Sequence, residues 1–121
     1  MPGVELIEVS GKEIIYIDYT NCDSGQMIEI FDRAKKMVLN KKEGNCLLLT
    51  NFEGAYITSS FMRHAEKEMV PIKHLITKNS FIGMTFPQRM ILKGFSLFIR
   101  KDVYVAFEDR EKALEYLICQ S

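Results

Sequence analysis

The fold rests on one apolar stretch, Cys46-Leu-Leu-Leu-Thr50, near the middle of the chain. A run without alternating polar residues is typical of a strand that is covered on both faces, as in a parallel sheet. A helical pattern precedes this stretch, and strand-like and helical patterns alternate after it. We therefore predict that the stretch is an interior strand of a layered α/β domain, in which helices connect parallel strands.

Toward the N-terminus, two short strands and a helix are predicted. The strands are Val4–Val9 and Glu13–Tyr19, and the tight turn between them predicts a hairpin. The helix begins near Asp23, because Asp23 followed by Gln26 forms the pattern of a capping box. Its apolar residues recur at helical spacing and are Met27, Ile28, Phe31, Ala34, Met37 and Val38.

Toward the C-terminus, a second helix is predicted from Thr58, with a break near Val70-Pro71, because a proline inside a helix kinks or ends it. Phe61, Ala65 and Met69 mark its inner face, and Ile72 and Ile76 continue the same spacing. The remaining predicted elements are a strand over Phe81–Thr85, a helix over Pro87–Arg100, a strand over Val103–Phe107 and a last helix after Asp109 with Ala113, Leu114, Leu117 and Ile118 inside. The chain is expected to be a single domain over residues 1–121.

Composition and charge exclude some classes of function. The chain has 16 basic and 16 acidic residues, so it lacks the net positive charge that drives nucleic-acid binding. No apolar run approaches the ~20 residues of a membrane span. Cys22, Cys46 and Cys119 are an odd number of widely spaced thiols, which indicates reduced cysteines. We expect a cytoplasmic protein that does not bind nucleic acid.

This order of elements resembles the STAS superfamily, and especially its bacterial SpoIIAA-like branch. One part of the likeness runs from Leu47–Thr50 through Gly54 to Ile57–Ser60, which resembles the family's strand, loop and Asp-Ser-Ser-Gly helix start. The other part joins Ser80–Met84 to Val105–Leu117, which resembles the branch's closing strand and final helix. The resemblance implies a STAS-like layered fold: a mixed sheet of about five strands with an N-terminal hairpin and about four helices.

The resemblance also implies a binding module and not an enzyme. In the family's anti-sigma-factor antagonists, a partner kinase phosphorylates the second serine of Asp-Ser-Ser-Gly, and Ser60 is the matching position. Thr58 stands in place of the acidic residue and Phe61 in place of the glycine, so a phospho-switch here would be degenerate. The SpoIIAA-like branch is also similar to the lipid-carrier fold of the CRAL-TRIO class, which implies an apolar ligand.

Three neighbouring hydroxyl residues, Thr58, Ser59 and Ser60, are the candidate phospho-switch site. A phosphate at a helix N-terminus meets free backbone N–H groups and a favourable helix dipole. Serine and threonine are also preferred helix caps without any phosphate. Because both flanking positions of the family signature differ, we favour capping as the role of these hydroxyls.

No catalytic residue, cofactor or metal site is predicted. His64 and His74 are the chain's 2 histidines, and each is interpreted as solvated or partly packed and not as a metal ligand. The sequence has no nucleophile triad order, phosphate-binding loop or dinucleotide fingerprint. An enzyme would need clustered acid–base groups in a pocket, for which the chain offers no motif.

The segment Pro87–Arg100 carries the main binding hypothesis. On a helical wheel its large apolar residues cover an arc of roughly 220°, against the ~100° that a surface helix needs to face its core. The excess predicts a second contact with a subunit, an apolar ligand or a bilayer, whereas deep burial within the domain is the alternative. These residues are Met90, Ile91, Leu92, Phe95, Leu97, Phe98 and Ile99.

Two functional hypotheses follow. The first is a non-enzymatic regulatory or carrier module that binds an apolar ligand, a membrane or a protein partner through the 87–100 helix. The second is an anti-sigma-factor-antagonist-like protein-interaction domain with a degenerate phospho-switch at Ser60. The expected partners are an apolar small molecule or lipid, another protein, or a second copy of the chain.

Overall fold

The core of the protein is one mixed β-sheet with the strand order β1-β2-β3-β4-β5. The computed structural model describes residues 2–41, 45–92 and 103–119. β1 and β2 are antiparallel, whereas β2, β3, β4 and β5 are parallel. The strands are β1 (Gly3–Val9), β2 (Lys12–Asp18), β3 (Cys46–Asn51), β4 (Ile76–Ile82) and β5 (Tyr104–Ala106). The predicted mixed sheet is confirmed.

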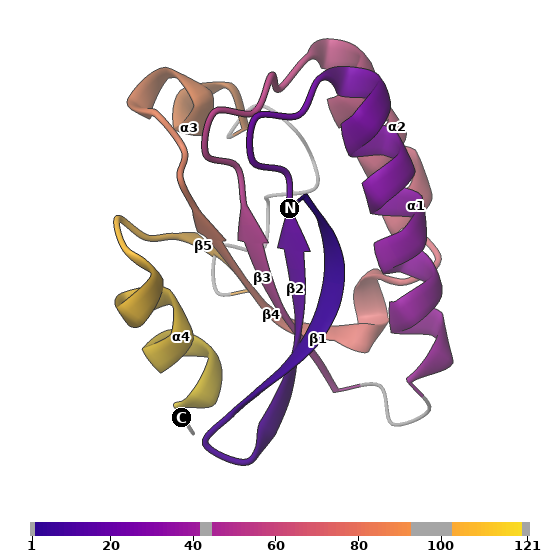
Figure 1. The fold of residues 1–121 in the computed structure, drawn as a ribbon. Helices are drawn as coiled ribbons and strands as arrows, with labels where there is room; N and C mark the ends of the chain where they lie inside the picture. The colour runs from indigo at the N-terminus through magenta and orange to yellow at the C-terminus, as the bar shows by residue number, and fades with distance from the viewer. Residues whose placement is uncertain (1, 42–44, 93–102, 120–121) are drawn as a thin grey trace.

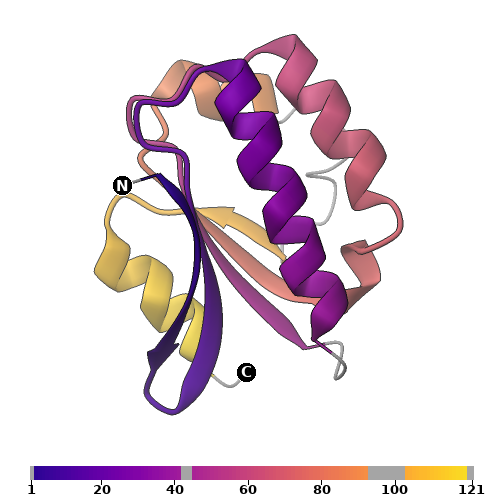
Figure 2. The same ribbon diagram turned by 45° about the vertical axis from the view of Figure 1, so that its right-hand side comes forward.

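Helices cover both faces of this sheet. α1 and α2 lie side by side on one face, α4 lies on the other, and α3 follows the carboxyl end of β4 (Figures 1 and 2). The α-helices in the described residues are α1 (Ser24–Asn40), α2 (Ser59–Met69), α3 (Phe86–Leu92) and α4 (Arg110–Ile118). The layered α/β prediction is therefore confirmed. None of the described helices is long and apolar enough to span a membrane.

A tight turn joins β1 and β2 into the predicted hairpin. Val9 pairs with Lys12, so the turn consists of Ser10 and Gly11. Both turn residues have positive φ, 51° and 80° respectively. This conformation is that of a type I′ turn, whose twist matches the twist of the two strands.

β3 is the central strand and is covered on both faces. Leu48 and Leu49 are adjacent, and only 3% and 0% of their surfaces are exposed. Because successive side chains of a strand point to opposite faces, Leu48 packs in the cluster with α1 and α2, and Leu49 packs in the cluster with α4. Burial on both sides explains why the stretch is apolar without alternation, and it confirms the interior position.

The predicted start of α1 is confirmed in detail. The Asp23 side chain accepts a hydrogen bond from the backbone N–H of Gln26 at 2.9 Å, and the Gln26 side chain accepts one from the backbone N–H of Asp23 at 3.0 Å. This reciprocal pair satisfies two N–H groups that a helix start leaves without partners. The residues of α1 that face the sheet and are buried are Met27, Ile30, Phe31, Ala34 and Val38.

α2 ends at Met69, just before Pro71, as predicted. The helical spacing of Ile72 and Ile76 does not extend the helix beyond that point. A 3₁₀ turn over Lys73–Leu75 follows, and β4 already begins at Ile76, whereas the sequence predicted a strand over Phe81–Thr85. The predicted strand boundaries are wrong because Ile76 pairs with Cys46 of β3. That long-range pairing outweighs the local spacing, and β-branched residues suit a strand.

Of the last two elements, β5 differs from the prediction in length, whereas α4 begins where the sequence predicted. β5 spans three residues, Tyr104–Ala106, instead of the expected Val103–Phe107. α4 begins after Asp109, whose side chain accepts a hydrogen bond from the backbone N–H of Lys112 at 2.8 Å, as the sequence predicted. Ala113 and Leu117 of α4 are buried, and Leu114 and Ile118 are partly buried against the same cluster.

Within the predicted helix over Pro87–Arg100, α3 covers the positions up to Leu92. Residues 93–102 lie outside the described residues, so the predicted arc of roughly 220° stays a prediction. Met90 is described, and 52% of its surface is exposed. The other members of the predicted apolar surface, whose side chains lie outside the description, are Ile91, Leu92, Phe95, Leu97, Phe98 and Ile99.

Candidate functional site

Three loops converge at the carboxyl end of the parallel strands. The β2–α1 and β3–α2 loops run side by side (Figure 2). The backbone N–H of Asn21 donates to the carbonyl of Glu53 at 2.9 Å, and the N–H of Tyr56 donates to the carbonyl of Cys22 at 3.0 Å. In α/β sheets this edge is where binding sites are usually built, because the loops that leave the strands meet there.

The third loop, β4–α3, approaches the β3–α2 loop closely at Gly83. This glycine has φ +77°, and a Cβ atom added to it would lie 2.5 Å from the backbone nitrogen of Glu53. The backbone N–H of Phe52 donates to the carbonyl of Ile82 at 2.9 Å in the same region. The glycine therefore permits an approach that any side chain at this position would block.

The three hydroxyl residues at the start of α2 have different surroundings. Thr58 is the N-cap: its Oγ1 accepts a hydrogen bond from the N–H of Phe61 at 3.2 Å and lies 2.9 Å from the Oγ of Ser24 on α1. Ser59 and Ser60 are exposed. Capping by Thr58 agrees with the sequence interpretation, whereas its bond to Ser24, 34 residues away, is a tertiary contact that the sequence pattern did not indicate.

Large apolar side chains are exposed on the β3–α2 loop and on α3. Tyr56 on the β3–α2 loop is 73% exposed, and Phe86 and Met90 on α3 are 74% and 52% exposed. We call these three residues the apolar rim. The Gln88 side chain donates to the carbonyl of Ala55 at 3.2 Å and so ties α3 to the β3–α2 loop. The rim therefore sits on two segments that are held together.

A small apolar cavity lies between the sheet and the two helices α1 and α2. Its volume is about 40 Å³, far below the ~300–1,000 Å³ of typical ligand pockets. Two buried polar residues, Thr50 and Asn79, also line the cavity, and the hydroxyl of Thr50 donates to the side-chain oxygen of Asn79 at 3.0 Å. A cavity of this size is too small for a lipid. Its apolar lining includes Phe31, Leu48, Phe61, Met62, Ala65 and Phe81.

Comparison with known proteins identifies the architecture. No family model matches the chain, and a search of curated protein sequences found no match. A solved structure, that of an anti-sigma-factor antagonist (STAS) domain protein from Planctomyces limnophilus, matches 97% of this chain and 99% of its own with a TM-score of 0.66. This chain has the STAS-domain fold. The identity is 13%, so the likeness shows the fold alone, and it confirms the fold that the sequence resemblance implied.

Burial keeps three titratable groups in the core of this STAS fold in their neutral forms. Burial raises the pKa of the Tyr19 hydroxyl far above its usual value, and the nearby Cys22 and Asp32 add to the effect. Burial also raises the pKa of the Cys22 and Cys46 thiols. Because neutral thiols are poor nucleophiles, we assign these two cysteines to the core and not to catalysis.

The histidines occupy different elements of the STAS fold. His74 is exposed on the 3₁₀ turn, whereas His64 is partly buried on α2 and lies 2.8 Å from a carboxylate oxygen of Asp32 on α1. Glu68 belongs to the same cluster. The sequence interpretation overlooked Glu68, although its position four residues after His64 places both side chains on one face of α2. The contribution of Asp32 required the packing of α1 against α2.

Proposed function

We propose that this STAS-fold chain is a regulatory protein-interaction domain whose docking surface lies at the carboxyl edge of the sheet. The observation that carries the proposal is the apolar rim: Tyr56 and Phe86 expose 73% and 74% of their surfaces on two segments that a hydrogen bond ties together. Aromatic residues are enriched at the centres of protein interfaces. Ser59 and Ser60 lie on the same edge, at the start of α2.

The fold and the cavity favour a protein partner over an apolar cargo. STAS domains generally serve as regulatory modules without catalysis, and the matched structure is named as an anti-sigma-factor antagonist domain protein. A carrier would need to enclose its ligand, and the apolar cavity found in the described residues, about 40 Å³ in volume, is too small for that. Met90 belongs both to the apolar rim and to the predicted 87–100 surface.

Site-specific photo-crosslinking in cells tests the docking surface. A photoreactive phenylalanine analogue would replace Tyr56 in one variant, Phe86 in a second and Leu39 in a third. Leu39 is the control, because it is also a large apolar residue with more than half of its surface exposed, 53%, and it lies near the C-terminal end of α1. α1 begins at the carboxyl edge of the sheet, so its C-terminal end lies at the opposite edge (Figure 2).

We expect a discrete covalent adduct from positions 56 and 86 and none from position 39. Mass spectrometry of the adduct then distinguishes a different protein from a second copy of the chain. Adducts of equal yield at all three positions, or at none, would contradict the proposed surface. Native mass spectrometry of the purified protein separately tests the carrier alternative, which requires a co-purified apolar ligand.

The phospho-switch is the finer part of the proposal. Ser60 is exposed in the first turn of α2, where a negative group would meet free backbone N–H groups. Because Thr58 and Phe61 stand in place of the acidic residue and the glycine of the family signature, we expect Ser60 to be an inefficient phosphosite. Ser60→Asp should change the free energy of unfolding by no more than about 1 kcal/mol, measured by urea denaturation. Stoichiometric phosphate at Ser60 in protein from its native host would refute the expected inefficiency.

A further inference from the structure

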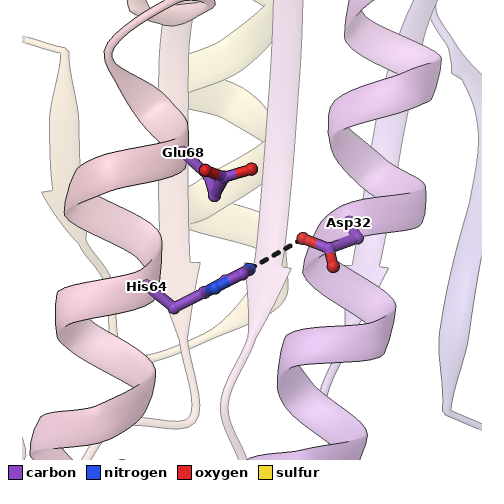
Figure 3. A group of neighbouring side chains, drawn as sticks. All are labelled: Asp32, His64 and Glu68. Carbon is purple, nitrogen blue, oxygen red and sulfur yellow. Dashed lines mark hydrogen bonds and ion pairs between the residues drawn. The ribbon is translucent and has the colours of Figure 1, made fainter.

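A histidine and two carboxylates meet between α1 and α2, on residues that the proposed docking surface does not use. Asp32 projects from α1, and His64 and Glu68 project from α2 into the same space (Figure 3). One ligand atom from each residue lies within 4.8 Å of the other two. All three residues are partly exposed, so an ion from solution can reach them.

The distances fit a tetrahedral ion with small side-chain adjustments. Zn²⁺ binds imidazole nitrogen and carboxylate oxygen at about 2.0–2.2 Å, which places neighbouring ligand atoms of a tetrahedral site about 3.3–3.6 Å apart. The Nε2 of His64 and the Oδ1 of Asp32 are 2.8 Å apart and would separate slightly. Glu68 would move inward, which rotation of its flexible side chain allows.

The donor set selects the class of metal. Imidazole suits zinc and its neighbours among the transition metals, whereas a site made of oxygens alone would suit Mg²⁺ or Ca²⁺. His64 and Glu68 are four residues apart on one helix, so they can chelate one ion from the same face. We propose that Asp32, His64 and Glu68 bind Zn²⁺ and that the ion ties α1 to α2, with a fourth position left for water or a partner's side chain.

Among the neighbours of the cluster, Phe31 favours the binding of an ion and Lys35 competes with it. The ring of Phe31 contacts the imidazole of His64 edge-on, with centroids 5.8 Å apart, and so restricts its orientation. Lys35 lies 3.2 Å from the carboxylate of Glu68 and already neutralises one negative charge. Zn²⁺ binding would displace this ammonium group, whose long, flexible side chain can turn toward solvent. Lys35 is therefore a built-in competitor of the metal.

Isothermal titration of chelator-stripped protein with ZnCl₂ tests the site, with Cys119→Ser as the background because Cys119 is an exposed thiol. We expect one Zn²⁺ per chain and a higher thermal unfolding temperature with the metal, because binding to the folded state alone stabilises it. His64→Ala should weaken binding at least about tenfold, since even residues that only support ligands matter by ~10–100-fold. His74→Ala is the matched control and should leave binding unchanged.

Two further substitutions distinguish a metal site from an ordinary ion-pair cluster. Asp32→Asn keeps the size of the side chain but removes a charged ligand, so it should weaken Zn²⁺ binding while the protein stays folded by circular dichroism. Lys35→Met should strengthen Zn²⁺ binding several-fold, because it removes a positive charge beside the ion. In addition, Co²⁺ bound in place of Zn²⁺ should give visible absorption bands that His64→Ala abolishes.

The proposal is overturned by any of three results. The first is no saturable Zn²⁺ binding by the parent protein. The second is equal affinity in the folded His64→Ala and His74→Ala variants. The third is weaker Zn²⁺ binding after Lys35→Met in protein that remains folded, since a competitor's removal cannot weaken binding.

Discussion

Replacement of Gly83 by alanine tests the close approach that builds the carboxyl edge of the sheet. Gly83 joins β4 to the loop before α3 and has φ +77°. An alanine Cβ there would lie 2.5 Å from the backbone nitrogen and 2.8 Å from the Cα of Glu53. Because these contacts involve backbone and not the flexible end of a side chain, the β3–α2 loop would have to shift.

The expected cost has two parts. A left-handed backbone conformation costs a residue with a Cβ atom ~1–2 kcal/mol. Overpacking against a backbone that resists movement costs a further ~1–3 kcal/mol. The sum, about 2–5 kcal/mol, is a large fraction of the free energy of unfolding of a typical domain, which is about 5–15 kcal/mol.

Gly11→Ala is the matched control for Gly83→Ala. Gly11 has nearly the same φ, +80°, but a Cβ added there would have nothing within 4 Å. Gly11→Ala should therefore lower the free energy of unfolding only by the conformational cost, ~1–2 kcal/mol. Urea denaturation of both variants measures the two free energies of unfolding. Equal losses in the two variants would refute the close approach between Gly83 and Glu53.

Two further predictions concern buried polar groups. Ser80 is fully buried, and its hydroxyl donates to a backbone carbonyl of α4 at 3.0 Å. Ser80→Ala should therefore reduce the free energy of unfolding, measured by urea denaturation, by about 1 kcal/mol. An unchanged value would contradict a stabilising role for this hydrogen bond. Burial raises the pKa of Tyr19, Cys22 and Cys46 in the folded state, so the unfolded chain loses protons at a lower pH than the folded protein. The free energy of unfolding should consequently fall as the pH rises above ~8.5, the unperturbed pKa of a thiol, and a rise over that range would contradict the burial.

The sequence predicted those features whose cause is local or periodic. The capping box of Asp23 and Gln26 was predictable because these two residues are three positions apart. The helical structure of α1 was predictable from the helical spacing of its apolar residues. The interior position of β3 was predicted from the unbroken apolar run at Cys46–Thr50, since such a run is typical of a strand that is buried on both faces. A cap at Asp109 and one among the hydroxyls of residues 58–60 were predicted for the same reason: a capping side chain and the N–H group it binds are three residues apart.

Tertiary structure decided everything that depends on which segments meet. β4 begins at Ile76 because Cys46 lies beside it in the sheet, although the local spacing of apolar residues is helical. The apolar rim exists because packing leaves Tyr56 and Phe86 uncovered, and a sequence pattern does not record which side chains find partners. His64 and Glu68 share a helix face by their spacing alone, but Asp32 joins them only because α1 packs against α2. Interactions between residues a few positions apart are determined by the local sequence, whereas binding sites are assembled from distant segments that the fold brings together.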